Sequence, residues 1–263
     1  MTVPLLHVDA FATQPFAGNP AGVCLLPAPR EAAWMQAIAA ELSLPATAFV
    51  TPVADGAWPL RWFSPAVELT LCGHGTLAAA HVLWETGRLA RDATARFATA
   101  AGTLAAVSEG GWIAMDFPAE PATETRAPVG LADALGVKPR WVGRNRLDYV
   151  VEVDDAPTLG AIAPDFRALT AIETRGVIVT ARADSPEFDF VSRFFAPRVG
   201  LPEDAVTGSA HCCLGPLWGA RLGRRELAGR QMSARGGVVR VAVAGERVKL
   251  AGQAVTVLRG ELL

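Results

Sequence analysis

One short motif occurs twice in the chain, and this repeat constrains the fold more than any other feature. Arg61–Pro65 reads RWFSP, and Arg193–Pro197 reads RFFAP 132 residues later. The pair Gly75-Thr76 follows the first copy by ten residues, and Gly208-Ser209 follows the second by eleven. Both copies then run through small and apolar residues to a tryptophan. The shared order predicts two similar domains, each with a strand, a loop and a helix, and a binding site in the cleft between them.

Hydrophobic periodicity predicts the elements of the two halves. Helices are expected at 31–42, 75–84 and 131–136, and strands at 5–11, 21–26, 47–50, 60–63, 95–98, 102–108, 112–117, 148–153, 176–182, 237–242 and 254–258. Residues 118–128, PAEPATETRAP, are the expected linker because they are rich in Pro, Ala and Thr. The expected domains are 1–118 and 119–251, and the last strand, 252–263, is a candidate to cross back to the first domain.

Composition argues against several classes of function. The chain is 51% hydrophobic and 19% charged, which is ample for a packed core. Its net charge of −2 gives no attraction toward nucleic acid or anionic membranes. Lys138 and Lys249 are the only lysines, and neither lies in a pattern suited to a Schiff base. We therefore expect no pyridoxal-phosphate cofactor and no nucleic-acid partner.

Cysteine usage and apolar runs bear on location. The four cysteines, Cys24, Cys72, Cys212 and Cys213, form no CxxC pair, which is typical of a reducing compartment. The first residues, MTVPLLHVDAF, lack the basic region and long apolar run of a signal peptide. Residues 69–84 are uncharged but short and polar for a membrane span, so a buried helix is expected there. The sequence predicts a cytoplasmic protein with no membrane partner.

Each copy of the repeat opens a helix with glycine, and this suggests a shared chemistry. Glycine lets the backbone approach a ligand closely. The first N–H groups of a helix have no internal partner and carry a partial positive charge. Two such helix starts facing one cleft predict a site for a small anion, such as the carboxylate of a metabolite. Thr76 and Ser209 are then N-caps, ligand donors or both.

Titratable residues lie beside both helix starts. Cys72 and His74 lie at the first, and Asp204 lies just before the second. A histidine and an aspartate on opposite walls of a cleft could move a proton between two positions of a bound acid. Structural roles stay open for all three residues. His74 could bond to a backbone carbonyl, Asp204 could cap a helix or form a turn, and Cys72 could be a small buried side chain.

Two other interpretations of LCGHGTLA, residues 71–78, are weaker. Gly73 and Gly75 match the dinucleotide fingerprint GxGxxG/A, but the preceding SPAVELTL has proline and glutamate where a buried parallel strand should be. Histidines at 74 and 81 together with Cys72 are metal ligands by type. On one helix the two histidines would lie ~10 Å apart along the axis, so they cannot share one ion. Neither a dinucleotide nor a metal is expected.

Five long stretches span the chain and together resemble one family. They are VDAFATQPFAGNPAGV, FSPAVELTLCGHGTLAAAHVL, DFVSRFFAPRVGLPEDAVTGSAH, QMSARGG and GQAVTVLRGEL, and the chain resembles the phenazine-biosynthesis PhzF-like family. The resemblance implies an α+β chain with the diaminopimelate-epimerase-like fold, in which two pseudo-symmetric domains each wrap a curved, mostly antiparallel sheet around a central helix. It also implies an interdomain active site, a homodimer, and isomerisation by proton transfer without cofactor or metal.

The resemblance also assigns residues to the expected site. His74 matches the family's active-site histidine, and Asp204 matches the aspartate of its ED-x-x-TGS stretch. The expected catalytic residues are His74, Asp204 and Cys72, and the expected substrate-binding residues are Gly73, Gly75, Thr76, Gly208 and Ser209.

The stretch LPATAFV, residues 44–50, departs from the family pattern LSETAFV. Ala46 stands where the family has its catalytic glutamate, and an alanine cannot carry a proton. Glu41 is five residues earlier on an expected helix, so it does not replace the missing carboxylate without a change of register. The phenazine-type isomerisation is therefore not implied unchanged.

Three interpretations follow from Ala46. The chain is an isomerase with altered acid and base groups, an isomerase whose acid comes from a residue that the sequence does not name, or a binding protein that keeps the anion cleft without chemistry. In the first case Cys72 is of interest, since related epimerases use a cysteine base. They use two, however, and Ala205 and Val206 stand where we expect the second thiol. The substrate class is a small carboxylate.

Overall fold

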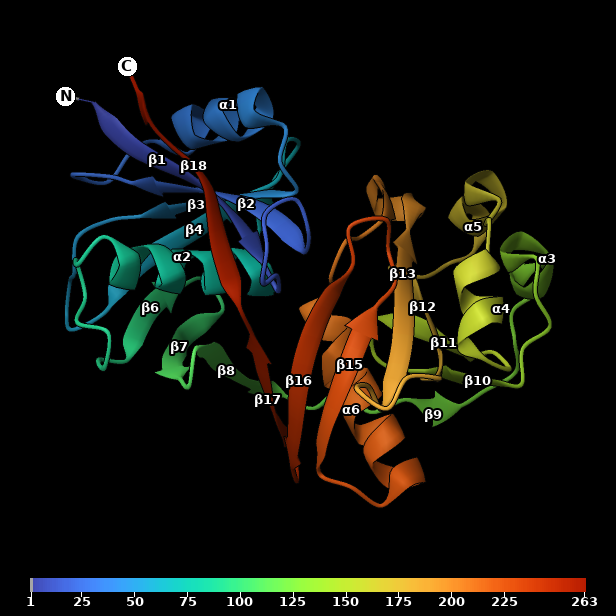
Figure 1. Ribbon diagram of the computed structural model, residues 1–263. Coiled ribbons are helices and arrows are strands. Elements are labelled where there is room, and N and C mark those ends of the chain that lie inside the picture. Colours follow the sequence, from blue (N-terminus) through green and yellow to red (C-terminus); the bar gives the residue numbers. More distant parts are fainter. Residues whose placement is uncertain (1) are drawn as a thin grey trace. The chain divides into compact units, whose positions relative to one another are not determined.

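The structure is a computed structural model that describes residues 2–263 (Figure 1). Contacts divide the chain into two compact units. Unit 1 holds the residues through Asp116 and then Ala251–Leu263, and unit 2 holds Phe117–Leu250. The chain therefore builds most of unit 1, then all of unit 2, and returns to unit 1 for its last strand.

Unit 1 is a mostly antiparallel sheet with two helices. Its elements are β1 (Val3–Ala10), β2 (Asn19–Leu25), α1 (Ala32–Leu42), β3 (Ala46–Val50), β4 (Trp58–Phe63), β5 (Glu68–Leu69), α2 (Gly73–Glu85), β6 (Ala95–Thr99), β7 (Gly102–Glu109), β8 (Trp112–Pro118) and β18 (Ala254–Leu262). The pairs β2–β3 and β4–β6 are parallel. The pairs β1–β18, β1–β2, β3–β4, β4–β5, β6–β7 and β7–β8 are antiparallel.

Unit 2 is built in the same way. Its elements are β9 (Thr123–Glu124), α3 (Leu131–Leu135), β10 (Trp141–Arg144), β11 (Asp148–Glu152), α4 (Ala156–Ala161), α5 (Phe166–Ala171), β12 (Gly176–Arg182), β13 (Phe190–Ala196), a short 3₁₀ turn (Pro197–Val199), β14 (Leu201–Glu203), α6 (Gly208–Leu222), β15 (Glu226–Gln231), β16 (Gly237–Ala244) and β17 (Arg247–Gly252). The pairs β11–β12 and β13–β15 are parallel, and β9–β10, β10–β11, β12–β13, β13–β14 and β15–β16 are antiparallel.

The two units therefore repeat one pairing scheme. Each unit begins with an antiparallel pair of strands, and a connection that contains helix then leads to a parallel third strand. The third strand pairs antiparallel with the strand of the RWF or RFF motif, which in turn pairs antiparallel with a short strand. A long helix follows, and the strand after it pairs parallel with the motif strand. The motif strand is β4 in unit 1 and β13 in unit 2. The α+β fold expected from the sequence is confirmed.

One long helix packs against the sheet of each unit. Nine of the thirteen residues of α2 are buried, and the helix packs against β1, β2 and β3. In unit 2, α6 packs against β15 and β16 (Figure 1). The buried helix expected over the uncharged stretch before Trp84 is confirmed. Across residues 2–263, no helix has the length and apolar character needed to span a bilayer.

The expected linker is wrong. Residues 118–128 belong to unit 2, where β9 pairs with β10 and the Ala119 and Glu120 amides donate to the carbonyls of Glu246 and Cys212. Several short elements were not expected: β5, β9, β10, α4, α5, the 3₁₀ turn, β14, β15 and β17. The two short helices have six residues each, too few for a helical period to be recognised, although Asp155 and Asp165 cap their N-termini.

Candidate functional site

The first helix start brings Cys72 and His74 together. Cys72 is the N-cap of α2, and Gly73 and His74 are its first two helical residues. The Cys72 Sγ lies 3.6 Å from His74 Nδ1 and 3.9 Å from Nε2. Cys72 is buried, and the His74 ring is half-buried. The carbonyl-bonded structural role considered for His74 is not what the contacts show, since its ring faces the sulfur.

Burial sets the protonation state of this pair. Loss of solvent lowers the pKa of His74 to about 4, from an ordinary value of 6.5. The imidazole is therefore neutral at pH 7 and has one nitrogen free to accept a proton. A neutral ring beside a sulfur is an arrangement that can accept a proton from a substrate or from the thiol.

The remaining residues of this helix start divide between open space and packing. A Cβ added at Gly73 would meet no atom of the described chain within 4 Å, so a ligand has room at this position. Gly75 is different, because an added Cβ would lie 2.8 Å from the Trp62 ring. Thr76 is fully buried, and its hydroxyl donates to the Cys72 carbonyl at 2.7 Å. Its side chain closes the first turn of α2.

At the second helix start, a buried glutamine fixes the loop that carries Asp204. Asp204 is buried, and its Oδ2 accepts a hydrogen bond from the Thr207 hydroxyl at 2.6 Å. The fully buried Gln231 accepts from the Thr207 amide at 2.9 Å and donates to the Asp204 carbonyl at 2.7 Å. Thr207, not Asp204, is the N-cap of α6. The role of cap considered for Asp204 is therefore wrong.

An arginine that sequence reasoning missed lies beside Ser209. Arg175 Nη2 donates to Ser209 Oγ at 3.0 Å, and its Nε donates to the fully buried Asp148 at 2.8 Å. One third of the Arg175 side chain stays exposed. This places an ion-paired guanidinium next to Gly208 and Ser209, the first two residues of α6. No local pattern could reveal it, since Arg175 and Ser209 are 34 residues apart.

Comparison of the two helix starts corrects the alignment of the repeat. Both helices begin one residue after their N-cap, so Gly73 corresponds to Gly208 and Cys72 to Thr207. Neither Thr76 nor Ser209 is an N-cap, which corrects that expectation. The place expected for a second thiol is occupied by Thr207, not by Ala205 or Val206. Only the first helix start carries a sulfur at the cap.

Ala46 is the first residue of β3 and is fully buried. It pairs with Ala21 on β2, as Gly176 pairs with Asp148 on β11 in the other unit. Both units thus have a residue without a functional side chain at this strand start.

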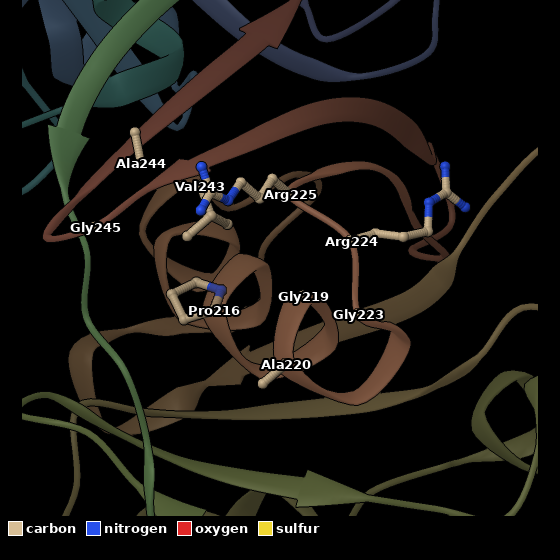
Figure 2. Close-up of a pocket in the computed structure, with 9 residues that line it drawn as sticks. All are labelled: Pro216, Gly219, Ala220, Gly223, Arg224, Arg225, Val243, Ala244 and Gly245. Carbon is tan, nitrogen blue, oxygen red and sulfur yellow. The ribbon is translucent and has the colours of Figure 1, made fainter.

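The expected site residues form no metal centre, and a separate surface hollow lies away from them. Within the described residues, no group of three or more histidine, cysteine, aspartate or glutamate side chains could hold a metal ion. His81 instead lies 3.0 Å from the Thr256 hydroxyl and 3.8 Å from Glu85. A surface depression of about 650 Å³ lies in unit 2 beside the C-terminal half of α6 (Figure 2). It is lined by Pro216, Gly219, Ala220, Gly223, Arg224, Arg225, Val243, Ala244 and Gly245, and includes none of the expected site residues.

Known proteins are similar to this chain over nearly its whole length. A model of the phenazine biosynthesis-like proteins matches residues 8–260. An uncharacterized isomerase of Halalkalibacterium halodurans is 50% identical over 264 residues, covering 100% of this chain and 99% of that protein. The crystal structure of a PhzF-family protein from Enterococcus faecalis is 40% identical, covers 100% of both chains and superposes with a TM-score of 0.96.

More distant structures share only the fold. A hydroxyproline epimerase from Agrobacterium vitis superposes with a TM-score of 0.65 at 12% identity, over 99% of this chain and 92% of that one. Together with the PhzF-family structures, it identifies the diaminopimelate-epimerase-like fold. On the match across nearly its whole length, the chain belongs to the phenazine biosynthesis-like (PhzF) family.

Proposed function

We propose that this protein is a cofactor-independent isomerase that moves a proton on a small carboxylate substrate. The observation that carries the proposal is the Cys72–His74 pair at the start of α2, with 3.6 Å between Sγ and Nδ1. The pKa of about 4 keeps the His74 ring neutral at pH 7, so it can accept a proton. Family membership and the isomerase relatives support this class of reaction.

A carboxylate is the proposed substrate group because both helix starts suit an anion. The first amides of α2 and α6 have no partner within their own helices. The space at Gly73 lets a carboxylate approach the backbone. The Arg175 guanidinium, which is ion-paired with Asp148, lies beside Ser209 and keeps one third of its side chain exposed to offer N–H donors at the start of α6. We therefore propose Gly73, Gly208 and Ser209 as carboxylate contacts.

Two proton carriers are proposed for the reaction. The Cys72–His74 pair removes a proton from a carbon of the substrate, and Asp204 is the second group, which returns a proton at another position or face. The Thr207 and Gln231 contacts hold the Asp204 loop in one conformation. That one substrate contacts both helix starts, and that the protein is a homodimer, stay predictions.

A second candidate is a carboxylate-binding protein without chemistry. It is favoured by Ala46, which is buried at the strand start where the family pattern has a glutamate. Proton exchange separates the two candidates, because an isomerase of this kind must exchange a substrate hydrogen with solvent and a binding protein need not.

The test is a thermal-shift screen of small carboxylates and amino acids, followed by NMR of each hit incubated with the protein in D₂O. We expect a hit to gain deuterium at a carbon. His74→Ala and Cys72→Ala should each slow this exchange by about 10²- to 10⁴-fold, the usual contribution of a general acid or base. Asp204→Asn should slow it similarly while keeping an acceptor for the Thr207 hydroxyl.

His81→Gln is the matched control, since His81 lies on the same helix and bonds to Thr256 instead of the proposed pair. It should exchange deuterium at the rate of the unmodified protein. Hits that bind but never exchange would overturn the isomerase and favour the binding protein.

A further inference from the structure

Trp62, next to the last residue of β4, has a buried polar atom without a partner. It pairs with Ala48 on β3 and with Leu69 on β5, and its side chain is 1% exposed. Its indole Nε1 has no hydrogen-bond partner within the described chain. Buried N–H groups are nearly always bonded, because a lost hydrogen bond to water must be replaced. This one therefore needs an explanation.

The Trp62 indole and the Cys72 sulfur both lie beside Gly75. A Cβ added at Gly75 would lie 2.8 Å from Trp62 Cδ1, 3.3 Å from Nε1 and 3.0 Å from Cys72 Sγ. The pyrrole edge of the indole and the sulfur therefore both lie within 3.3 Å of one point beside the α2 backbone. Glycine at position 75 is what allows this approach.

The second unit lacks both members of this contact. The strand motif places Phe194 on β13 where Trp62 stands on β4, since Arg61 and Arg193 each form an ion pair with a glutamate of the next strand. At the helix start, Thr207 takes the place of Cys72. A phenyl ring therefore fills the equivalent position in unit 2, without an N–H group. At this strand position, the indole N–H occurs in the unit whose helix cap is a cysteine, and the phenyl ring occurs in the unit whose cap is a threonine.

We propose that Trp62 is a positioning residue for the Cys72 thiolate, whose sulfur accepts the hydrogen bond of the indole N–H. The inference rests on the proposed function, in which Cys72 takes part in proton transfer. When the S–H bond breaks, the proton leaves to water or to the unprotonated nitrogen of His74, and the sulfur becomes a strong acceptor. A bond made mainly in the anionic state favours that state.

The charged and titratable groups on the neighbouring elements contact either the Cys72 sulfur or other partners. His74, on α2, is a titratable group in contact with the sulfur. On the adjacent strands, Arg61 and Glu68 bond to each other, and Asp9 accepts from the Phe16 amide.

The first test measures alkylation of Cys72 by iodoacetamide against pH, with peptide mass mapping to separate it from the three other cysteines. Trp62→Phe should slow alkylation about tenfold or more on the acidic limb and move the midpoint to higher pH, since a hydrogen bond to a charged group is lost. Trp84→Phe is the matched control. Trp84 lies on α2, the helix capped by Cys72, and its indole N–H donates to the Ala93 carbonyl at 3.0 Å. This substitution should leave the profile unchanged.

The second test uses the unmodified sequence, so it does not depend on folding of a variant. With ¹⁵N-labelled tryptophan, one indole N–H resonance should move with the midpoint of Cys72, and this movement should vanish in Cys72→Ser. An alkylation profile unchanged by Trp62→Phe, or no indole that titrates with Cys72, overturns the proposal. Neither readout needs a substrate. If no carboxylate exchanges deuterium, the isomerase is rejected, whereas the role of Trp62 is decided by the alkylation and NMR results alone.

Discussion

At the scale of single residues, His211 is a buried imidazole with one nitrogen bonded. Its Nδ1 lies 2.8 Å from the Thr207 carbonyl, which can only accept, so Nδ1 carries the proton. Its Nε2 is buried and without a partner. Burial lowers the pKa of His211 to about 4, because a charged ring would lose its hydration.

This pKa predicts a loss of stability in mild acid. The folded value lies below the unfolded one, so the unfolded chain binds the proton first, and stability falls as pH drops from about 6.5 toward 4. Between pH 7 and pH 5, the contribution of His211 should fall by about 2 kcal/mol. His211→Gln should therefore lose about 2 kcal/mol less than the unmodified protein over this range in urea denaturation. Equal pH dependence of the two proteins would contradict the assignment.

Sequence spacing could predict some neighbours at this scale and not others. Cys72 and His74 lie two residues apart at one helix start, so the local pattern alone indicated that they could act together. Gln231 contacts Thr207 from 24 residues away, and no local pattern carries that information. Trp62 is one of two differences within the repeated motif, RWFSP against RFFAP, but its approach to Gly75 depends on how β4 packs on α2.

At the scale of elements, the repeated arginine shows how the same motif serves two different environments. Arg61 forms two hydrogen bonds to Glu68, and Arg193 forms two to Glu203. The Arg61 side chain is 41% exposed and the Arg193 side chain 11%. Arg193 also donates to the Ile162 carbonyl, just after α4, at 2.6 Å. It thus connects α4, β13 and β14, whereas Arg61 connects two strands at the surface.

The two arginines should therefore differ in their contribution to stability. Arg193→Ala leaves Glu203 and a backbone carbonyl without their donor, and should lower the free energy of unfolding by about 3 kcal/mol or more. Arg61→Ala removes an exposed pair and should cost less than about 1 kcal/mol. Urea denaturation of both variants gives the comparison. Similar losses would show that burial does not separate the two pairs.

The elements themselves were predictable where the pattern was long. The helix expected at 31–42 is α1, and its eleven residues are enough for the helical period to appear. β15, with the sequence ELAGRQ, has glycine and charged residues in place of an apolar alternation, so pattern alone did not reveal it. It forms because β13 and β16 supply its two partners.

At the scale of the whole molecule, the two-domain repeat could be predicted from the sequence, but the register between the first and last strands could not. β18 pairs with β1 from Val3–Leu262 to Ala10–Ala254, across some 250 residues. Such pairing depends on where both strands lie in the folded sheet, which local sequence does not contain. The return of Ala251–Leu263 makes the stability of unit 1 depend on the last residues of the chain.

This dependence gives a prediction for a truncated chain. Deleting residues 253–263 removes β18 and turns β1 into an edge strand, with Val3, Leu6 and Val8 losing a neighbouring strand. Amide exchange of residues 3–10, followed by mass spectrometry, should become at least about 100-fold faster, since opening of β1 no longer requires β18 to leave. Residues 176–182 in β12 of unit 2 should keep their protection. Deleting Leu263 alone, which lies beyond β18 and is fully exposed, should change neither strand. Equal loss of protection in β1 and β12 would mean that the units unfold as one body, because removal of a strand from unit 1 would then destabilise both.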